Sequence, residues 1–342
     1  MSSRAGRLVG RVDRYLLAIL ATVATASVIP ASGLAGRLFS DLSQAAIGLL
    51  FFLYGARLST RAALDGMRSW RLHGAVLAAT FVLFPLLGLA CRLLEPGVLE
   101  PSLYFGVMFM CLLPSTVQSS IAFTSIARGN VPAAICSASF SNLLGVVVTP
   151  ALAAVFLGSA VDVSAGSVLR IAGQLLVPFG LGQLARPRIG GLLETHRSLV
   201  GLVDRGSVLL VVYSAFSAGV VAGIWHQVTP PRLAALLIVD AAILATVLAA
   251  TAYGSRRLGL DAADRIVVIF CGSKKSIATG IPIAAVLFAR RDVSLIVLPA
   301  MLFHQIQLMV CAVLARRFAR RERPAPGRPS TRGLGLAGVD HG

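Results

Sequence analysis

Charged side chains are scarce in this 342-residue chain, at 13% of the residues against about 25% in ordinary soluble proteins. So few charges cannot cover the surface of a soluble globule of this size, and 56% of the residues are hydrophobic. Lysine is nearly absent: Lys274 and Lys275 stand beside 29 arginines. The net charge of +17 is typical of nucleic-acid binding, but these arginines cluster between long apolar runs. We therefore expect membrane topology to explain the charge, and no nucleic-acid partner.

Sequence signatures of catalysis and of metal binding are also missing. The chain has no GxSxG, Walker loop, HExxH or dinucleotide fingerprint. Its five cysteines lie singly in or beside apolar stretches, without a cysteine or histidine nearby at ligand spacing, which argues against a disulfide framework and a zinc site. We therefore expect no enzyme, no catalytic residue, no metal and no cofactor.

Ten apolar runs dominate the chain instead. A hydrocarbon core of about 30 Å needs about 20 apolar residues per helix. Runs of about that length, bounded by charge, proline or glycine, cover residues 15–29, 42–56, 74–91, 102–127, 131–157, 168–185, 202–224, 233–253, 265–289 and 293–315. They predict an all-α polytopic membrane protein with ten transmembrane helices.

The arginines indicate how these helices are oriented. With the N-terminus in the cytoplasm, 23 arginines fall on the cytoplasmic side and 6 on the outside. Cytoplasmic loops carry such an excess of positive charge. We expect a multi-pass protein of the cell membrane with both termini in the cytoplasm. Residues 316–342, which hold seven arginines and several prolines, are predicted to form a disordered tail that contacts anionic lipids.

Two of the predicted spans are interrupted at their centres. Residues 114–120 of the fourth read Pro-Ser-Thr-Val-Gln-Ser-Ser, and residues 271–276 of the ninth read Cys-Gly-Ser-Lys-Lys-Ser. Each is the fourth helix of a set of five, and residues 118–122 parallel residues 274–278. These matches predict two inverted repeats, residues 1–157 and 158–315. Paired interrupted helices at corresponding positions indicate a transporter's binding site.

The candidate substrate-binding or ion-binding residues are the polar side chains in and near these interruptions. They are Ser115, Thr116, Gln118, Ser119 and Ser120 in the fourth span, Ser139 and Asn142 in the fifth, Ser273, Lys274, Lys275 and Ser276 in the ninth, and His304 in the tenth. Two ionised, unpaired lysines at a helix centre would cost about 5–7 kcal/mol. Asp240, in the middle of the eighth span, is the expected charge partner. The alternative is a structural Lys–Asp pair that only fixes packing.

The interrupted spans also resemble a known family. The fourth and fifth spans, from Pro114 through Ala-Arg-Gly-Asn at 127–130 to Thr149 and Pro150, resemble bile acid:sodium symporters. The string at 271–276 resembles more closely a divergent SBF-like branch of that superfamily, akin to the seventh member of human solute carrier family 10. The resemblance covers nearly the whole chain. It implies a panel of helices 1, 2, 6 and 7 against a core of helices 3–5 and 8–10, with helices 4 and 9 crossing.

The resemblance also carries an expectation about ions. In sodium-coupled members, a Ser-Asn pair on helix 4, hydroxyls on helix 5, and a Glu with a following Gln on helix 9 hold two sodium ions. The matching residues here are Ser119 and Ser120, Ala134 and Ala138, Phe270, and Lys274. An anionic ligand is lost and a cation is gained, so Lys274 is expected to replace a bound cation.

We therefore expect a secondary transporter of a small or amphipathic organic anion, working by alternating access without the usual sodium sites. One alternative is a sodium-coupled symporter of bile acids or other organic anions that uses relocated ligands. The other is a membrane regulatory protein of ion homeostasis that does not transport.

Overall fold

A computed structural model describes residues 14–57, 69–95, 97–158, 165–221, 223, 229–288 and 293–321. In these ranges all regular secondary structure is helical, which confirms the predicted class. The elements are α2 (Arg14–Val28), α3 (Gly33–Arg57), α5 (Trp70–Ala78), the π turn η1 (Ala79–Leu83), α6 (Phe84–Ala90), the 3₁₀ turn η2 (Cys91–Leu94), α7 (Pro101–Leu112), α8 (Gln118–Ile126), α9 (Val131–Leu157), α10 (Ala165–Thr195), α11 (Arg197–Val221), α13 (Pro230–Arg257), α14 (Ala262–Gly272), α15 (Ile277–Leu287) and α16 (Val293–Arg321).

Seven stretches of the described residues are long and apolar enough to cross a membrane, so the chain is a multi-pass membrane protein. They are Gly33–Arg57, Trp70–Leu94, Val131–Leu157, Ser198–Val221, Pro230–Arg257, Ala262–Ala284 and Leu295–Arg320. Three of the ten predicted spans are not among them and stay predictions. The first falls on α2, which has 15 residues. The fourth is divided between α7 and α8, and the sixth lies within the longer helix α10.

The last helix extends further than the sequence predicted. We expected the disordered tail to begin at residue 316, but α16 continues to Arg321. A helix that leaves the hydrocarbon need not end there, because arginine is a good helix former and its charge favours the C-terminal end of a helix. Residues 322–342 lie outside the described part of the chain.

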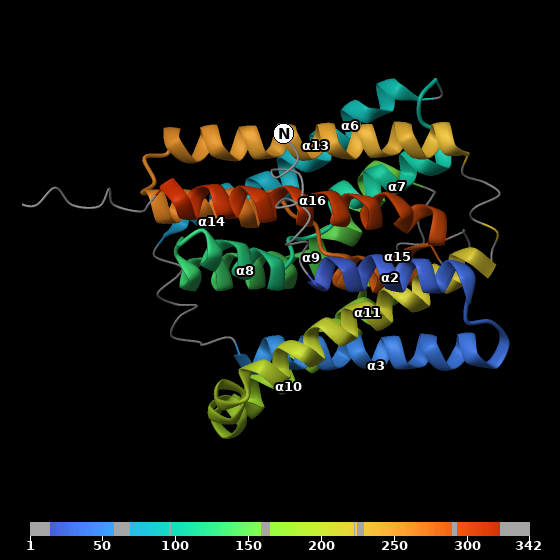
Figure 1. Ribbon diagram of the computed structural model, residues 1–342, viewed down its shortest axis with the longest axis horizontal. Helices are drawn as coiled ribbons and strands as arrows, with labels where there is room; N and C mark the ends of the chain where they lie inside the picture. Colours follow the sequence, from blue (N-terminus) through green and yellow to red (C-terminus); the bar gives the residue numbers. More distant parts are fainter. Residues whose placement is uncertain are drawn as a thin grey trace, which may run out of the picture.

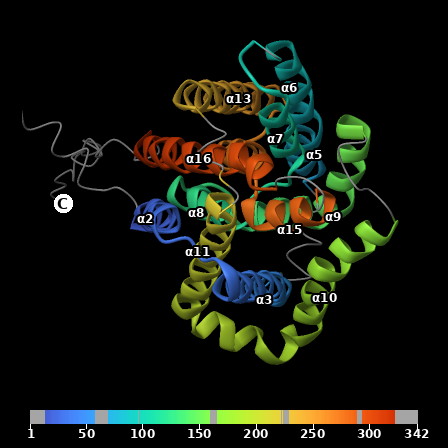
Figure 2. The same ribbon diagram turned by 90° about the vertical axis from the view of Figure 1, so that its right-hand side faces the viewer.

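The helices pack in two groups, which we call the α3 group and the α13 group. In the α3 group, α3 packs against α10 and α11, and α11 packs against α2. In the α13 group, α13 packs against α14 and α16, and α16 packs against α7 and α8. Figures 1 and 2 show α3, α10 and α11 on the lower side of both views, opposite α13 and α6. Helix α15 packs against α16 and belongs to the α13 group, and it contacts α10 and α11 across the boundary between the groups.

Glycines hold α3 and α10 unusually close together. A Cβ atom on Gly55 would lie 2.0 Å from the carbonyl oxygen of Phe179, and one on Gly182 would lie 2.0 Å from that of Phe52. The side chain of Gln183 donates a hydrogen bond to the Gly55 carbonyl at 2.8 Å. Small residues allow such close backbone approach between membrane helices. The two helices therefore form a tightly packed pair.

Candidate functional site

The two helix interruptions lie where the sequence placed them, and they are in contact. The first separates α7 from α8, and the second separates α14 from α15. The Ser115 hydroxyl donates a hydrogen bond to the Cys271 carbonyl at 2.6 Å, although 156 residues separate them. The backbone N–H of Ser276 donates to the Pro114 carbonyl at 2.9 Å. We call this meeting point, residues 113–117 and 273–276, the break junction.

Local sequence explains why the helices stop there. Pro114 has no N–H to donate and cannot continue a helix. It packs against α9 at Gly145, where a Cβ atom would lie 2.6 Å from the proline Cβ. On the other side of the junction, Ser276 caps α15, because its hydroxyl accepts a hydrogen bond from the Thr279 N–H at 3.3 Å. Proline, glycine and a serine cap thus allow the two interrupted spans to meet.

The ammonium group of Lys275 lies inside a set of backbone oxygens. Its Nζ donates to the carbonyls of Thr80 at 2.9 Å, Cys111 at 2.8 Å and Leu113 at 2.7 Å. These three hydrogen bonds use all the donors that a lysine ammonium has. The Nζ also lies 4.0 Å from the centre of the Phe84 ring. Lys275 is therefore a buried cation with every donor satisfied.

The three carbonyls are available because of local helix geometry. Cys111 and Leu113 lie at the C-terminal end of α7, where carbonyl groups lack partners within the helix and the helix dipole is negative. Thr80 lies in the π turn η1, whose hydrogen-bond spacing differs from that of an α-helix. The end of a half-helix and a π turn together form a cation-binding cradle, which we call the carbonyl cradle.

The backbone of Lys275 is held separately, by α16. The Gln307 side chain accepts a hydrogen bond from the Lys275 N–H at 2.9 Å and donates one to the Lys275 carbonyl at 3.1 Å. Gln307 in turn contacts the Nδ1 of His304 at 2.7 Å. The predicted site residue His304 thus supports the break junction through Gln307.

Lys274 has a different environment. It is fully buried, and its Nζ has no hydrogen-bond partner among the residues that the structure describes. The Nζ lies 3.9 Å from the centre of the Phe123 ring and 5.4 Å from that of Phe270. Aromatic faces attract a cation, so these contacts offset part of the cost of burying it.

Asp240 does not pair with either lysine, and this part of the prediction is wrong. The residue is fully buried on α13, and both carboxylate oxygens lack a hydrogen-bond partner in the described part of the chain. Its electrostatic neighbours are the thiols of Cys91 and Cys111. Hydropathy shows how deep a residue lies along a span but not which neighbouring helix it faces.

Asn142 on α9 links both sides of the break junction. Its Nδ2 donates to the carbonyls of Ser115 and Ala138, and its Oδ1 accepts a hydrogen bond from the Thr279 hydroxyl at 2.6 Å. Both the nitrogen and the oxygen of the Asn142 amide are therefore hydrogen-bonded to protein groups.

The other predicted residues divide between the junction and its edges. The Thr116 hydroxyl contacts those of Ser119 at 2.7 Å and Ser120 at 3.3 Å. Ser139 and Ser273 are buried, whereas Gln118 and Ser119 at the start of α8 are partly exposed. The structure thus gathers most of the predicted site residues at or beside one junction.

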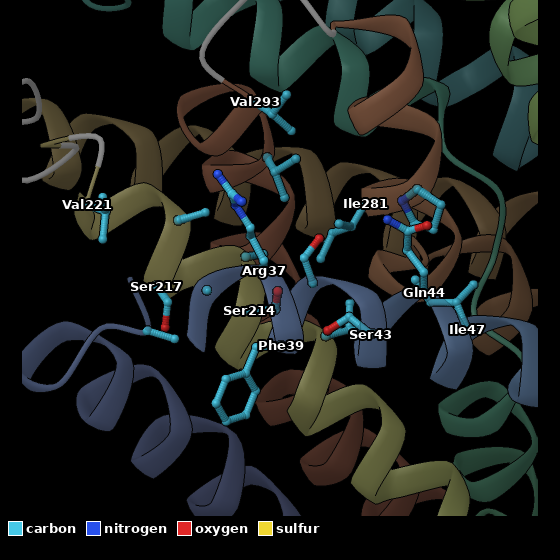
Figure 3. A pocket seen from close by; sticks show the side chains of 18 of the residues that line it. Arg37, Phe39, Ser43, Gln44, Ile47, Ser214, Ser217, Val221, Ile281 and Val293 are labelled. Atoms are coloured by element: carbon cyan, nitrogen blue, oxygen red, sulfur yellow. The ribbon is translucent and has the colours of Figure 1, made fainter. Parts of the chain in front are cut away.

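A cavity of about 830 Å³ lies apart from these residues, between α3, α10 and α11 on one side and α15 and α16 on the other. Its lining includes two arginines, Arg37 and Arg170, and no predicted site residue. Figure 3 shows Arg37 and Gln44 projecting from α3, with Ile281 and Val293 from the α13 group facing them. Ligand-binding pockets commonly have volumes of about 300–1,000 Å³.

Several of these residues were missed or misjudged in the sequence. Arg37 and Arg170 counted only as topology signals, and Gln44 was not among the candidate site residues. The role of Thr80 rests on its backbone carbonyl, which leaves no signal in the side chain. Gln307 carries a partial signal, since a glutamine deep in an apolar helix needs a polar partner.

The comparisons with known proteins agree with this architecture. The sequence profile of the SBF-like CPA transporter family matches residues 13–320. An uncharacterized protein of Pseudomonas aeruginosa is 53% identical, with 92% of this chain and 95% of the relative aligned. The Escherichia coli protein YfeH is 47% identical, with 91% of this chain and 94% of that protein aligned. Sodium/bile acid cotransporter 7 of Rattus norvegicus is 28% identical, with 90% of this chain and 93% of that protein aligned.

Proposed function

This chain belongs to the SBF-like CPA transporter family, and on that basis we propose that it is a secondary transporter of a small or amphipathic organic anion, in which a lysine ammonium replaces the coupling cation. The observation that carries the proposal is the set of three carbonyl oxygens around the Nζ of Lys275. In transporters with interrupted helices, unwound carbonyls and half-helix C-terminal ends bind the coupling ion. The carbonyl cradle has this composition.

The geometry favours Lys275 for the role that the family resemblance suggested for Lys274. Lys275 makes three hydrogen bonds to backbone oxygens, whereas Lys274 contacts aromatic rings and makes none. A site for a hard cation is lined by oxygen. A permanently attached ammonium would keep this site filled without sodium.

Alternating access then requires two bodies that move against each other. We propose that the α3 group acts as the panel and the α13 group as the core that the resemblance implies. The cavity at their boundary supports this division, because a transported molecule must contact both bodies. Positive charge in the cavity, from Arg37 and Arg170, favours an anion.

Sodium-coupled transport is the competing mechanism, and it is favoured by the name of the rat relative, a sodium/bile acid cotransporter. Against it, the chain has Phe270, Ala134 and Ala138 where sodium-coupled members have oxygen-bearing side chains. Hydrocarbon side chains cannot coordinate sodium.

Counterflow of labelled organic anions in proteoliposomes separates the two mechanisms. We expect equal flux in sodium and choline buffers. A strict sodium requirement in the unaltered protein would overturn the lysine mechanism, and absence of flux for every anion tested would favour the regulatory alternative.

A substitution makes this experiment sharper. Lys275→Ala empties the carbonyl cradle, so flux should fall and then recover partly when ammonium or sodium is added. Lys274→Ala is the matched control, and added cations should not restore its flux, because no carbonyl cradle surrounds that Nζ. Recovery of both variants, or of neither, would argue against the assignment.

A further inference from the structure

The two walls of the cavity differ in chemistry. The wall formed by α3, α10 and α11 carries its polar side chains, among them Arg37, Gln44, Arg170 and Gln174. The wall formed by α15 and α16 is apolar, with Ile281, Val286, Val293, Val297 and Met301. A molecule that contacts both walls of the cavity needs a polar edge and a hydrocarbon face.

The two arginines occupy similar positions on two neighbouring helices. Helices α3 and α10 run in the same direction, since Gly48 packs against Pro178 and, further along both helices, Gly55 packs against Phe179. Arg37 lies in the second turn of α3, and Arg170 in the second turn of α10. Each of these neighbouring helices therefore contributes one arginine from its N-terminal part to the cavity lining.

Among the residues that the structure describes, neither arginine has an acidic partner. In the part of the chain that the structure describes, no carboxylate pairs with Arg37 or Arg170, although Arg232 and Glu100 form an ion pair elsewhere. The described residues that line the cavity include no Asp or Glu, and Asp41, four residues after Arg37, is not among them. Two guanidinium groups thus line the cavity, with no acidic residue in the described part of its lining.

We propose that this cavity binds an organic dianion with an apolar body. The two negative charges bind between Arg37 and Arg170, and the carbon skeleton packs against the wall formed by α15 and α16. The inference rests on the proposed transport function and narrows its substrate class from organic anions in general to doubly charged ones. The planar fork of arginine suits phosphate and carboxylate groups, which accept paired hydrogen bonds.

Two probes with the same apolar body and different charge test this proposal. At about pH 8, 1-naphthyl phosphate carries two negative charges because its second pKa is about 6, whereas 1-naphthyl sulfate carries one. Affinities are measured by calorimetry on the purified chain in phosphatidylcholine nanodiscs. We expect the phosphate to bind about tenfold tighter, since it gains one more charge-assisted contact. Equal affinities would overturn the proposal.

Substituting each arginine in turn tests which residues cause the preference for the phosphate over the sulfate. Arg37→Gln and Arg170→Gln should each bring phosphate affinity close to that of the sulfate, while sulfate affinity changes less. Arg92→Gln is the matched control, because Arg92 is another exposed arginine of the predicted outer side and does not line the cavity. A phosphate preference that survives in both cavity variants would disprove the assignment.

A lipid headgroup is the other source of phosphate chemistry, and it carries a single charge as a phosphodiester. Adding phosphatidylglycerol to the nanodiscs should leave naphthyl phosphate binding unchanged. Strong competition by that lipid would assign the arginines to the bilayer and overturn the proposal.

Flux measurements keep this inference separate from the proposed function. Transport of anions without any preference for double charge would reject the dianion site and leave the transporter intact. Dianion binding that depends on the arginines, without flux of any anion, would support the site and reject transport.

Discussion

The side chain of Gln307 on α16 holds the backbone of Lys275 by two hydrogen bonds, one to its N–H at 2.9 Å and one from the glutamine amide to its carbonyl at 3.1 Å. These bonds replace the ones that the ninth span loses where it stops being helical. The backbone and the Nζ of Lys275 are therefore fixed by separate sets of partners.

Replacing Gln307 tests how much this contact contributes to the stability of the protein. Gln307→Leu leaves two buried backbone groups without partners, each costing about 1–3 kcal/mol, so we expect a loss of about 2–6 kcal/mol in stability. Gln305→Leu is the matched control, because Gln305 is partly exposed and its Oε1 already lacks a partner in the described chain. Thermal unfolding in detergent should place the Gln307 variant well below the control. The reverse order would contradict the role given to Gln307.

Substitutions of the two lysines should differ in their effect on the stability of the protein. Lys275→Met leaves three buried carbonyls without a donor, and at about 1 kcal/mol or more each the loss is about 3 kcal/mol or greater. Lys274→Met removes only contacts with aromatic rings, worth about 0.5–2 kcal/mol, and also removes the cost of burying a charge. We expect the Lys275 variant to unfold at a clearly lower temperature. Similar melting temperatures would refute the distinction between the two sites.

Close packing of α3 and α10 predicts a third result. Gly182→Ala places a Cβ atom 2.0 Å from the Phe52 carbonyl, so the helices must separate. Overpacking of this kind costs about 1–3 kcal/mol. Gly180→Ala, on the same helix, has nothing within 4 Å of the new atom and should be tolerated. Melting temperatures of the two variants check this, and equal values would show that the pair can separate freely.

The orientation of the chain is a prediction from the arginine distribution alone. Ser3 and Ser330 lie outside the described residues, and both should be cytoplasmic. In a cysteine-free background, Ser3→Cys and Ser330→Cys should resist impermeant maleimide in intact cells and react after lysis. Labelling of only one of them in intact cells would exclude an even number of spans, and labelling of both would show that both termini lie outside.

Much of the fold could be predicted from the sequence because the bilayer restricts what a chain can do. Apolar length indicates spans, and Pro114, Gly272 and the neighbouring serines indicate where a span is interrupted. The contact between the two interruptions was expected from the family resemblance, which implies that helices 4 and 9 cross. These features depend on local chemistry and on chain order, both of which are visible in a sequence.

The details of the site were harder to predict, for a physical reason. Lys274 and Lys275 are neighbours, so only the direction of each side chain distinguishes their surroundings, and direction depends on packing. The carbonyl cradle consists of backbone atoms, which every residue has. Asp240 was assigned a partner by depth alone. Arg37 and Arg170 lie near helix ends, where arginine is common for topological reasons. The sequence therefore held no pattern that indicated the cavity they share.

The carbonyl cradle also has a consequence for the order in which the protein is made. Its oxygens belong to residues 162 to 195 positions before Lys275. At about 5–20 residues per second, a ribosome needs roughly 10–40 seconds to cover that interval. During this time the acceptors from Thr80, Cys111 and Leu113 have no lysine to bind. The early spans must therefore wait in the membrane, in a loosely assembled state, until the ninth span is inserted and completes the centre of the protein.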